Sequence, residues 1–201
     1  TTLRAAAFHY DYSDFQIMQV EDFTAIFLNA DDAEITGMEL ELTSVLNDSW
    51  MVNAGLTLLE TEYGEYLQED LSVFDGAKVQ IAGNPLNNAP QASLILGVTY
   101  DTILSSGSKL SLSVDGAYRS RVYFREFGNV DDSQEGYTIV NFNANWVSAD
   151  EDYAARFFVS NLTDKAHVTG MYALQTTYGR QGTWNMPRQA GFEITKFFGA
   201  R

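Results

Sequence analysis

The sequence of 201 residues contains no cysteine, only 3 prolines, and only 12 lysines and arginines against 27 aspartates and glutamates. The absence of cysteine excludes a disulfide scaffold, a thiolate metal site and a cysteine nucleophile. The net charge of −15 repels phosphate backbones, so we expect no nucleic acid partner. No run of 18 apolar residues occurs, which excludes a transmembrane helix. A transmembrane β-barrel stays possible, because its strands need only alternate apolar and polar residues.

The start of the chain lacks the features of a secreted precursor. It reads Thr1-Thr2-Leu3, with neither an initiator Met nor a charged segment leading into an apolar one. A signal peptide has both of these features. We therefore expect a mature chain or an internal fragment of a longer protein.

Familiar catalytic motifs are missing as well. The sequence contains no Gly-x-Ser-x-Gly, P-loop, Gly-x-Gly-x-x-Gly or His-Glu-x-x-His motif. His9, expected on an inward face, and His167 have no ligand-spaced partner, and Glu39 and Glu41 stand two residues apart, as in any polar strand face. We expect no enzymatic activity, no cofactor and no metal site.

Alternation of apolar and polar residues is the strongest signal in the chain. From Leu110 to Phe124, six of the eight even-numbered positions are apolar or aromatic, and five of the seven odd-numbered positions are polar or charged. This period of two predicts a β-strand with one apolar and one polar face. At about 3.3 Å per residue the strand would be roughly 50 Å long, which suits a large barrel better than a sandwich.

The same alternation predicts nine strands in all. Their expected ranges are 3–12, 15–28, 34–46, 49–63, 91–102, 109–124, 137–147, 153–161 and 188–198. Short connections of turn-forming residues lie at 13–14, 47–48, 105–107 and 148–152, and long connections lie at 64–90, 126–136 and 162–187, with the short link 29–33 as an exception on the long side. Outer-membrane barrels have short periplasmic turns and longer extracellular loops. We therefore expect an all-β, antiparallel, up-and-down transmembrane β-barrel.

Aromatic residues on the apolar faces give a further signal. If the short turns face the periplasm, these residues gather beside that side as one interfacial girdle. A soluble β protein also places aromatic residues at strand ends, but it has no need of them on one edge and one face. The expected girdle consists of Tyr10, Tyr12, Trp50, Tyr100, Trp146, Tyr153 and Phe198.

Four motifs, in this order and spacing, resemble the C-terminal third of the barrel of TonB-dependent outer-membrane receptors. Ala7 to Gln16 resembles the family's Phe-Tyr-x-Asp-Tyr-x-Asp-x-Gln turn, and Gly37 to Glu41 resembles its Gly-x-Glu-x-Glu strand. Asn161 to Lys165 matches the Asn-Leu-x-Asp-Lys motif, and Pro187 to Phe198 looks like the last strand. The sequence departs from the family in two places. Three residues follow Phe198, and His167 stands where the family usually has Tyr.

The resemblance implies that residues 1–201 are the C-terminal portion, about nine strands, of a 22-strand barrel with a plugged lumen. The N-terminal plug and the earlier strands would then lie outside this sequence. It implies active import of a scarce nutrient of the ferric siderophore, cobalamin or oligosaccharide class. Its implied partners are the remainder of the barrel and the plug, TonB through the absent N-terminal segment, outer-membrane lipid, lipopolysaccharide and a small-molecule ligand.

Ligand contacts are expected on the inward face and in the long loops. The arginines have an alternative role in pairing with carboxylates of the plug or of neighbouring strands, and the aromatic residues in packing the loops together. The candidates are Arg119, Arg121, Tyr123, Tyr66, Phe127, Tyr178 and Trp184.

Two other functions stay open on the sequence. A passive porin-like outer-membrane channel would lack a plug upstream. A soluble all-β binding module, such as a carbohydrate-binding sandwich, would pack its apolar face against a second sheet and would not need the girdle.

Overall fold

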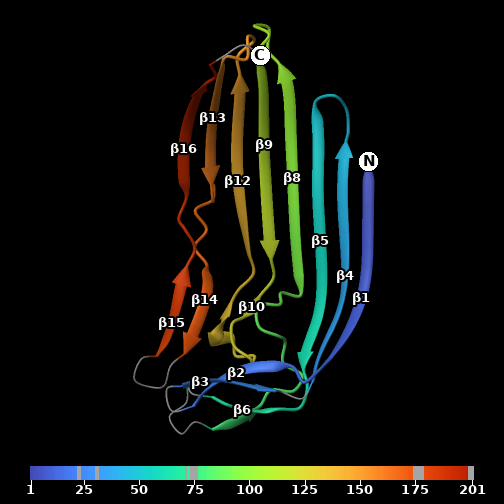
Figure 1. Cartoon of the computed structure of the whole chain (residues 1–201), viewed down its shortest axis with the longest axis vertical. Helices are drawn as coiled ribbons and strands as arrows, with labels where there is room; N and C mark the ends of the chain where they lie inside the picture. The colour runs from blue at the N-terminus through green and yellow to red at the C-terminus, as the bar shows by residue number, and fades with distance from the viewer. Residues whose placement is uncertain (22–23, 30–31, 71, 73–76, 174–178, 199–201) are drawn as a thin grey trace.

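The computed structural model describes residues 1–21, 24–29, 32–70, 72, 77–173 and 179–198. Its main feature is one antiparallel sheet of eight long strands, which Figure 1 shows as a single layer. In spatial order these are β1 (Thr2–Ser13), β4 (Asp32–Val45), β5 (Trp50–Tyr63), β8 (Ala92–Ile103), β9 (Lys109–Arg119), β12 (Tyr137–Val147), β13 (Tyr153–Ser160) and β16 (Gln189–Lys196). None of the described helices is long and apolar enough to cross a membrane.

Four small two-stranded hairpins lie in the connections at one end of the sheet (Figure 1). The three tight turns between β4 and β5, β8 and β9, and β12 and β13 lie at the opposite end. The hairpins are β2 (Gln16–Glu21) with β3 (Thr24–Asn29), β6 (Leu67–Glu69) with β7 (Lys78–Gln80), β10 (Val122–Tyr123) with β11 (Ser133–Gln134), and β14 (Val168–Ala173) with β15 (Arg180–Trp184). A short 3₁₀ turn, η1 (Val130–Asp132), precedes β11.

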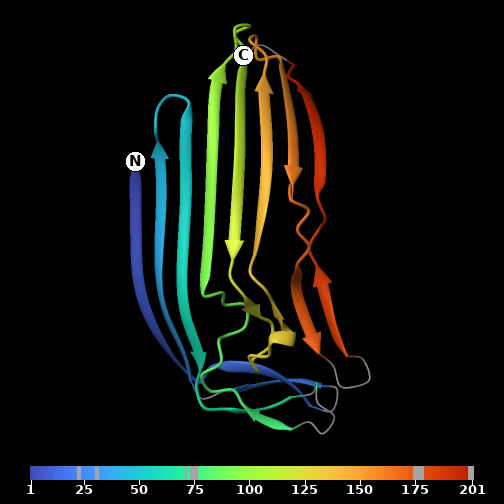
Figure 2. The same cartoon turned by 180° about the vertical axis from the view of Figure 1, so that it is seen from behind.

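The register of the sheet separates the apolar and polar faces. Val114 lies beside Val98 and Phe142 on one face, while Ser113 lies beside Thr99 and Asn143 on the other. Seen from behind in Figure 2, the sheet remains one layer, and no second sheet covers the apolar face of the described strands. This arrangement argues against the soluble sandwich, whose apolar face would be packed.

The prediction of a single strand at 15–28 is wrong. This segment contains the separate hairpin of β2 and β3, and β1 pairs directly with β4 in the large sheet. The large sheet therefore has eight strands and not nine. Asp14 has a left-handed φ of 57° at the end of β1, where the chain leaves the sheet. Strands of six residues, such as β2 and β3, are too short to span a bilayer, which needs about 9 to 11 residues.

Two members of the expected girdle are also misplaced. Because β1 runs directly to the hairpin end, Tyr10 and Tyr12 lie there, and their partners Ile35 and Ala33 place them on the inner face. His9, expected on the inner face, pairs with Thr36 on the outer face. The link at 29–33, expected as a short exception among the long connections, lies at the end of the longer connection between β1 and β4. The remaining girdle residues lie at the tight-turn end: Trp50, Tyr100, Trp146, Tyr153 and Phe198.

The strand expected at 109–124 ends earlier, at Arg119. Ser120 still bonds Ala92 through its backbone N–H at 2.9 Å, and its hydroxyl accepts from the Ala92 N–H at 3.0 Å. The chain then turns away into β10, and Val122 of β10 and Phe124 just after it are only 7% and 9% exposed. These two residues continue the alternation but pack within the loops and do not face outward.

The two edges of the sheet, β1 and β16, have no partner strand on their outer sides among the described residues. The sheet is therefore open, as expected for a segment of a larger barrel. Its compact apolar core lies at the hairpin end, where the ends of β4 and β5 meet the loops. That core consists of Ala33, Tyr63, Ile81, Leu86 and Phe127.

Candidate functional site

Three long loops gather at the hairpin end. The first loop is residues 64–91, the second loop is residues 120–136 and the third loop is residues 161–188. The apolar core joins the first two, because Ile81 and Leu86 of the first loop pack with Phe127 of the second. A further link is the side-chain amide of Asn84, which donates to the Glu126 carbonyl at 2.9 Å.

A chain of four charged side chains connects all three loops. Asp132 is fully buried, and its Oδ2 accepts from Nη1 of Arg125 at 3.0 Å while its Oδ1 accepts from Nε of Arg180 at 2.6 Å. Nη2 of Arg125 also donates to Oδ1 of Asp70 at 2.6 Å. We call Asp70, Arg125, Asp132 and Arg180 the ion chain. It runs from the first loop through the second to the third.

Local backbone geometry places the central pair of the ion chain. Val122 pairs with Gln134 and Tyr123 with Ser133, so β10 and β11 return the chain toward Arg125. The η1 turn then directs Asp132 inward, and its backbone N–H donates to the Asn129 carbonyl at 3.0 Å.

Hydrogen bonds affect the pKa values of Asp70 and Arg180 in the ion chain more than burial does. Burial on its own raises the pKa of Asp70, but hydrogen bonds from Arg125 and from Ser72 hold that pKa below its usual value. The hydrogen bond to Asp132 raises the pKa of the Arg180 guanidinium. Both pKa shifts favour the charged forms of the two end members, Asp70 and Arg180.

The mouth of the inner wall carries an exposed arginine beside an aromatic stack. Arg119 ends β9 and lies opposite Tyr137 of β12, on the inner face. The ring of Tyr137 stacks on His167 with centroids 3.8 Å apart. The Arg119 side chain is exposed, makes no hydrogen bond or ion pair with a described residue, and acts through its charge on His167.

Burial lowers the pKa of His167, a hydrogen bond with the backbone of Lys165 opposes this, and the positive charges of Lys165 and Arg119 lower it further. The net effect is a lowered pKa, so the imidazole is neutral at pH 7. Its backbone N–H donates to Oδ1 of Asn185 at 2.9 Å. His167 therefore stacks on Tyr137 as an uncharged ring of the third loop. Arg119 is then the cation beside Tyr137.

The structure separates the expected ligand contacts into exposed and packed residues. Arg121 donates to Ser133 at 2.7 Å and pairs with Glu135 at 3.3 Å, so it ties the second loop together. Tyr66 packs against the apolar core, and Phe127, only 8% exposed, lies under the Arg125 guanidinium at 4.6 Å. Both side chains therefore pack within the loops, and their contact with a ligand stays a prediction.

The remaining expected contacts lie apart from one another. Tyr123 is half-buried in β10, and its carbonyl accepts from the backbone N–H of Asn88 at 2.9 Å. Trp184 is 66% exposed at the end of β15. Tyr178 lies outside the described residues. No single cluster of described residues therefore unites the expected set.

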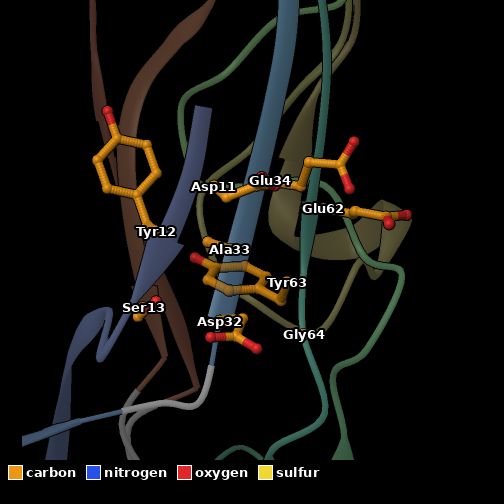
Figure 3. A pocket seen from close by; sticks show the side chains of 9 residues that line it. All are labelled: Asp11, Tyr12, Ser13, Asp32, Ala33, Glu34, Glu62, Tyr63 and Gly64. Atoms are coloured by element: carbon orange, nitrogen blue, oxygen red, sulfur yellow. The ribbon is translucent and has the colours of Figure 1, made fainter. Parts of the chain in front are cut away.

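A separate hollow of about 300 Å³ opens at the hairpin ends of β1, β4 and β5 (Figure 3). Figure 3 shows the Tyr12 ring on one side and the Glu34 and Glu62 carboxylates on the other. With Asp11 and Asp32 also present, the lining is acidic and would repel an anionic ligand. Among the described residues, no group of three His, Asp or Glu side chains is placed to hold a metal ion.

The Asn-Leu-x-Asp-Lys motif builds the turn that starts the third loop. Asn161, at a left-handed φ of 51°, accepts from the Lys165 N–H at 2.8 Å and donates to the Met186 carbonyl at 3.3 Å. Asp164 accepts from the Arg188 N–H at 2.8 Å. The motif therefore closes the base of the loop and has a structural role.

Comparison with known proteins identifies the family. A family model described as TonB dependent receptor-like, beta-barrel, matches residues 1–162. The chain belongs to this family. It is thus part of a bacterial outer-membrane β-barrel of the TonB-dependent receptors, which are transport receptors and not enzymes.

Individual relatives agree with this assignment. The chain is 24% identical over 179 residues to the probable TonB-dependent siderophore receptor PiuA of Acinetobacter baumannii, covering 85% of the chain and 22% of PiuA. It matches the crystal structure of the ferric yersiniabactin uptake receptor FyuA of Yersinia pestis with a TM-score of 0.78 and 21% identity, covering 98% of the chain and 27% of FyuA. The crystal structure of PiuA matches with a TM-score of 0.71, 22% identity and coverages of 96% and 25%. The chain thus spans about a quarter of the length of each relative.

Sequence reasoning missed Arg125, Asp132 and Arg180. Asp70 and Arg125 are 55 residues apart, and Asp132 and Arg180 are 48 apart, so no local spacing indicates their pairing. The available signal was scarcity, since arginines in the loops of a chain with 27 acidic residues are candidates for buried ion pairs.

Proposed function

We propose that the chain is the C-terminal portion of a receptor barrel that imports a ferric siderophore across the outer membrane, with energy relayed by TonB. The plug and the earlier strands belong to the same receptor in this proposal. The observation that carries it is the open sheet itself, with an apolar outer face, a polar inner wall and linked loops at one end only. Such a wall fits a plugged barrel that receives its ligand from one side.

A ferric siderophore is the substrate class favoured over cobalamin or an oligosaccharide. PiuA is named a probable siderophore receptor and FyuA a ferric yersiniabactin receptor, although identities of 24% and 21% support the fold more than the substrate. The independent support is Arg119, an exposed cation beside the Tyr137 ring in a chain with a net charge of −15. Ferric complexes with catecholate or carboxylate ligands are anionic and suit such a position.

The proposed membrane partners follow from the outer face of β4 and β5. Met38 pairs with Leu58 at the limit of the apolar band toward the hairpin end, and beyond them Thr36 pairs with Glu60 and Glu34 with Glu62. Charged groups are costly in hydrocarbon, so we place the boundary of the lipid on the hairpin side of Met38. The carboxylates would then lie at the level of the lipopolysaccharide head groups, where divalent cations can bridge them.

Equilibrium binding to the whole receptor in lipid tests the substrate class. We expect an anionic ferric catecholate to bind, and cobalamin and a malto-oligosaccharide not to bind. Arg119→Gln should weaken siderophore binding about tenfold, a loss of roughly 1.4 kcal/mol. The matched control is Arg4→Gln, since Arg4 lies on the same inner face at the opposite end and pairs with Glu41. Equal affinities of the two variants, or binding of cobalamin instead, would refute the proposal.

A further inference from the structure

We propose that the ion chain fixes the three long loops as one body before any ligand arrives, with Asp132 as the positioning residue. This inference rests on the proposed function only where it concerns ligand affinity. Both carboxylate oxygens of Asp132 are occupied, one by each arginine, so the side chain bonds the second loop to the third and holds the arginine that reaches the first. The first loop is connected only indirectly to Asp132, through Arg125, which bonds both Asp132 and Asp70.

Burial makes the ion chain costly to break. Asp132 is fully buried, and the side chains of Asp70 and Arg125 are 6% and 11% exposed. Removing one member of such a set leaves an unpaired charge out of water, so the remaining groups must move toward solvent. For Asp132 that movement would separate the loops.

The third loop contacts the second loop and the sheet near its base, and the second loop again near its tip. Near its base, the Val168 N–H donates to the side chain of Gln134 at 2.8 Å, and His167 stacks on Tyr137. Near its tip, Arg180 of β15 reaches Asp132. The hairpin of β14 and β15 would keep its base contacts without Arg180, but its tip would lose this link to the second loop.

The ion chain also orders the aromatic side chains of the loops. Arg125 lies over the Phe127 ring, and Phe127 packs in the core against which Tyr66 also packs. Trp184 lies on the same hairpin as Arg180. A ligand that meets loops already in place does not have to order them on binding. We therefore expect loss of the ion chain to weaken affinity without removing any ligand contact.

The test uses the whole receptor in lipid and hydrogen exchange of the backbone without ligand. Asp132→Asn and Arg180→Gln should both speed exchange of β14 and β15, residues 168–173 and 180–184, about tenfold, because the hairpin then opens more often. The double variant should be no faster than Asp132→Asn, since Arg180 acts through Asp132. Arg180→Lys, which keeps the charge, should restore part of the protection. The control is Glu65→Gln, because Glu65 is an exposed carboxylate of the first loop that is outside the ion chain.

Siderophore affinity is the second measurement. We expect Arg180→Gln to weaken ferric siderophore binding about tenfold while Glu65→Gln keeps the wild-type affinity. Wild-type exchange in Arg180→Gln, which should fold because its side chain is 42% exposed, overturns the inference, and so does fast exchange with unchanged affinity. If the wild-type receptor binds no siderophore, the proposed function fails, while the exchange result still decides whether the loops are tied.

Discussion

The inner and outer faces of β9 differ residue by residue, although neighbouring side chains are only one position apart. Val114 is 46% exposed on the apolar face, and Ser113 lies between the polar side chains of Thr99 and Asn143. In a lipid environment this difference sets the cost of a buried charge. Single substitutions at the two positions therefore test which face meets the membrane.

We expect Val114→Arg to destabilise the receptor by about 2 to 4 kcal/mol, because it places a cation in the hydrocarbon near the middle of the strand. Ser113→Arg projects into the polar interior and should cost much less. The measurement is a chemical unfolding titration of the whole receptor in lipid vesicles. Equal costs for the two variants would show that the faces are assigned wrongly.

His167 gives a prediction about pH. Its pKa is lowered in the folded protein, chiefly by burial, so the unfolded chain binds the proton more readily. The contribution of His167 is therefore constant above the unfolded pKa of about 6.5 and falls as the pH drops below it. Between about pH 7.5 and about pH 5.5, the wild-type receptor should lose more thermal stability than His167→Phe, which keeps a ring beside Tyr137.

The comparison is between the two losses of melting temperature, since other groups titrate equally in both proteins. An identical loss in wild type and His167→Phe would show that the imidazole is not protected from protonation.

Whole strands were predictable where the alternation is long and bounded by turn residues. β5, β8 and β12 lie within a few residues of their expected ranges, because each has one apolar face and is bounded at one end by a tight turn. The hairpin within 15–28 was not predictable, because the two strands of a hairpin and one long strand show the same period of two. The end of β9 was missed for a related reason, since Val122 and Phe124 continue the pattern while packing in the loops.

The candidate site was less predictable than the strands. Arg119 follows from the parity of β9, and its exposure on the inner wall agrees with that expectation. The ion chain depends on the relative positions of three loops, and those positions follow from tertiary packing around Ile81 and Phe127. Alternation and turn residues carry no information on such long-range pairs.

The position of Ser13 distinguishes the two strand arrangements. In the observed fold β1 ends at Ser13 on the hairpin side, whereas a spanning strand at 15–28 would have placed this turn in the periplasm. Ser13→Cys in the whole receptor should therefore react with a membrane-impermeant maleimide on intact cells. Ser106→Cys, in the tight turn between β8 and β9, should react only after the outer membrane is opened.

Labelling of Ser106→Cys on intact cells, with Ser13→Cys protected, would reverse the orientation of the sheet. Protection of both cysteines on intact cells would favour the arrangement with nine strands.

On the scale of the whole molecule, the sheet is a segment of barrel wall. The outer edges of β1 and β16 leave backbone N–H and C=O groups without partners among the described residues. Each such group costs several kcal/mol in hydrocarbon, so an open edge is not stable in a membrane. We infer that strands elsewhere in the receptor pair with both edges and enclose the lumen that the polar wall lines.

The central claim is that this wall belongs to a TonB-driven siderophore importer and not to a passive channel. The most direct measurement is uptake of a radioactive ferric siderophore by iron-starved cells that express the whole receptor, with and without a functional TonB protein. We predict uptake with TonB and no uptake without it, although binding to the cell surface persists in both. Equal uptake in the two strains would contradict the claim and favour the porin-like channel.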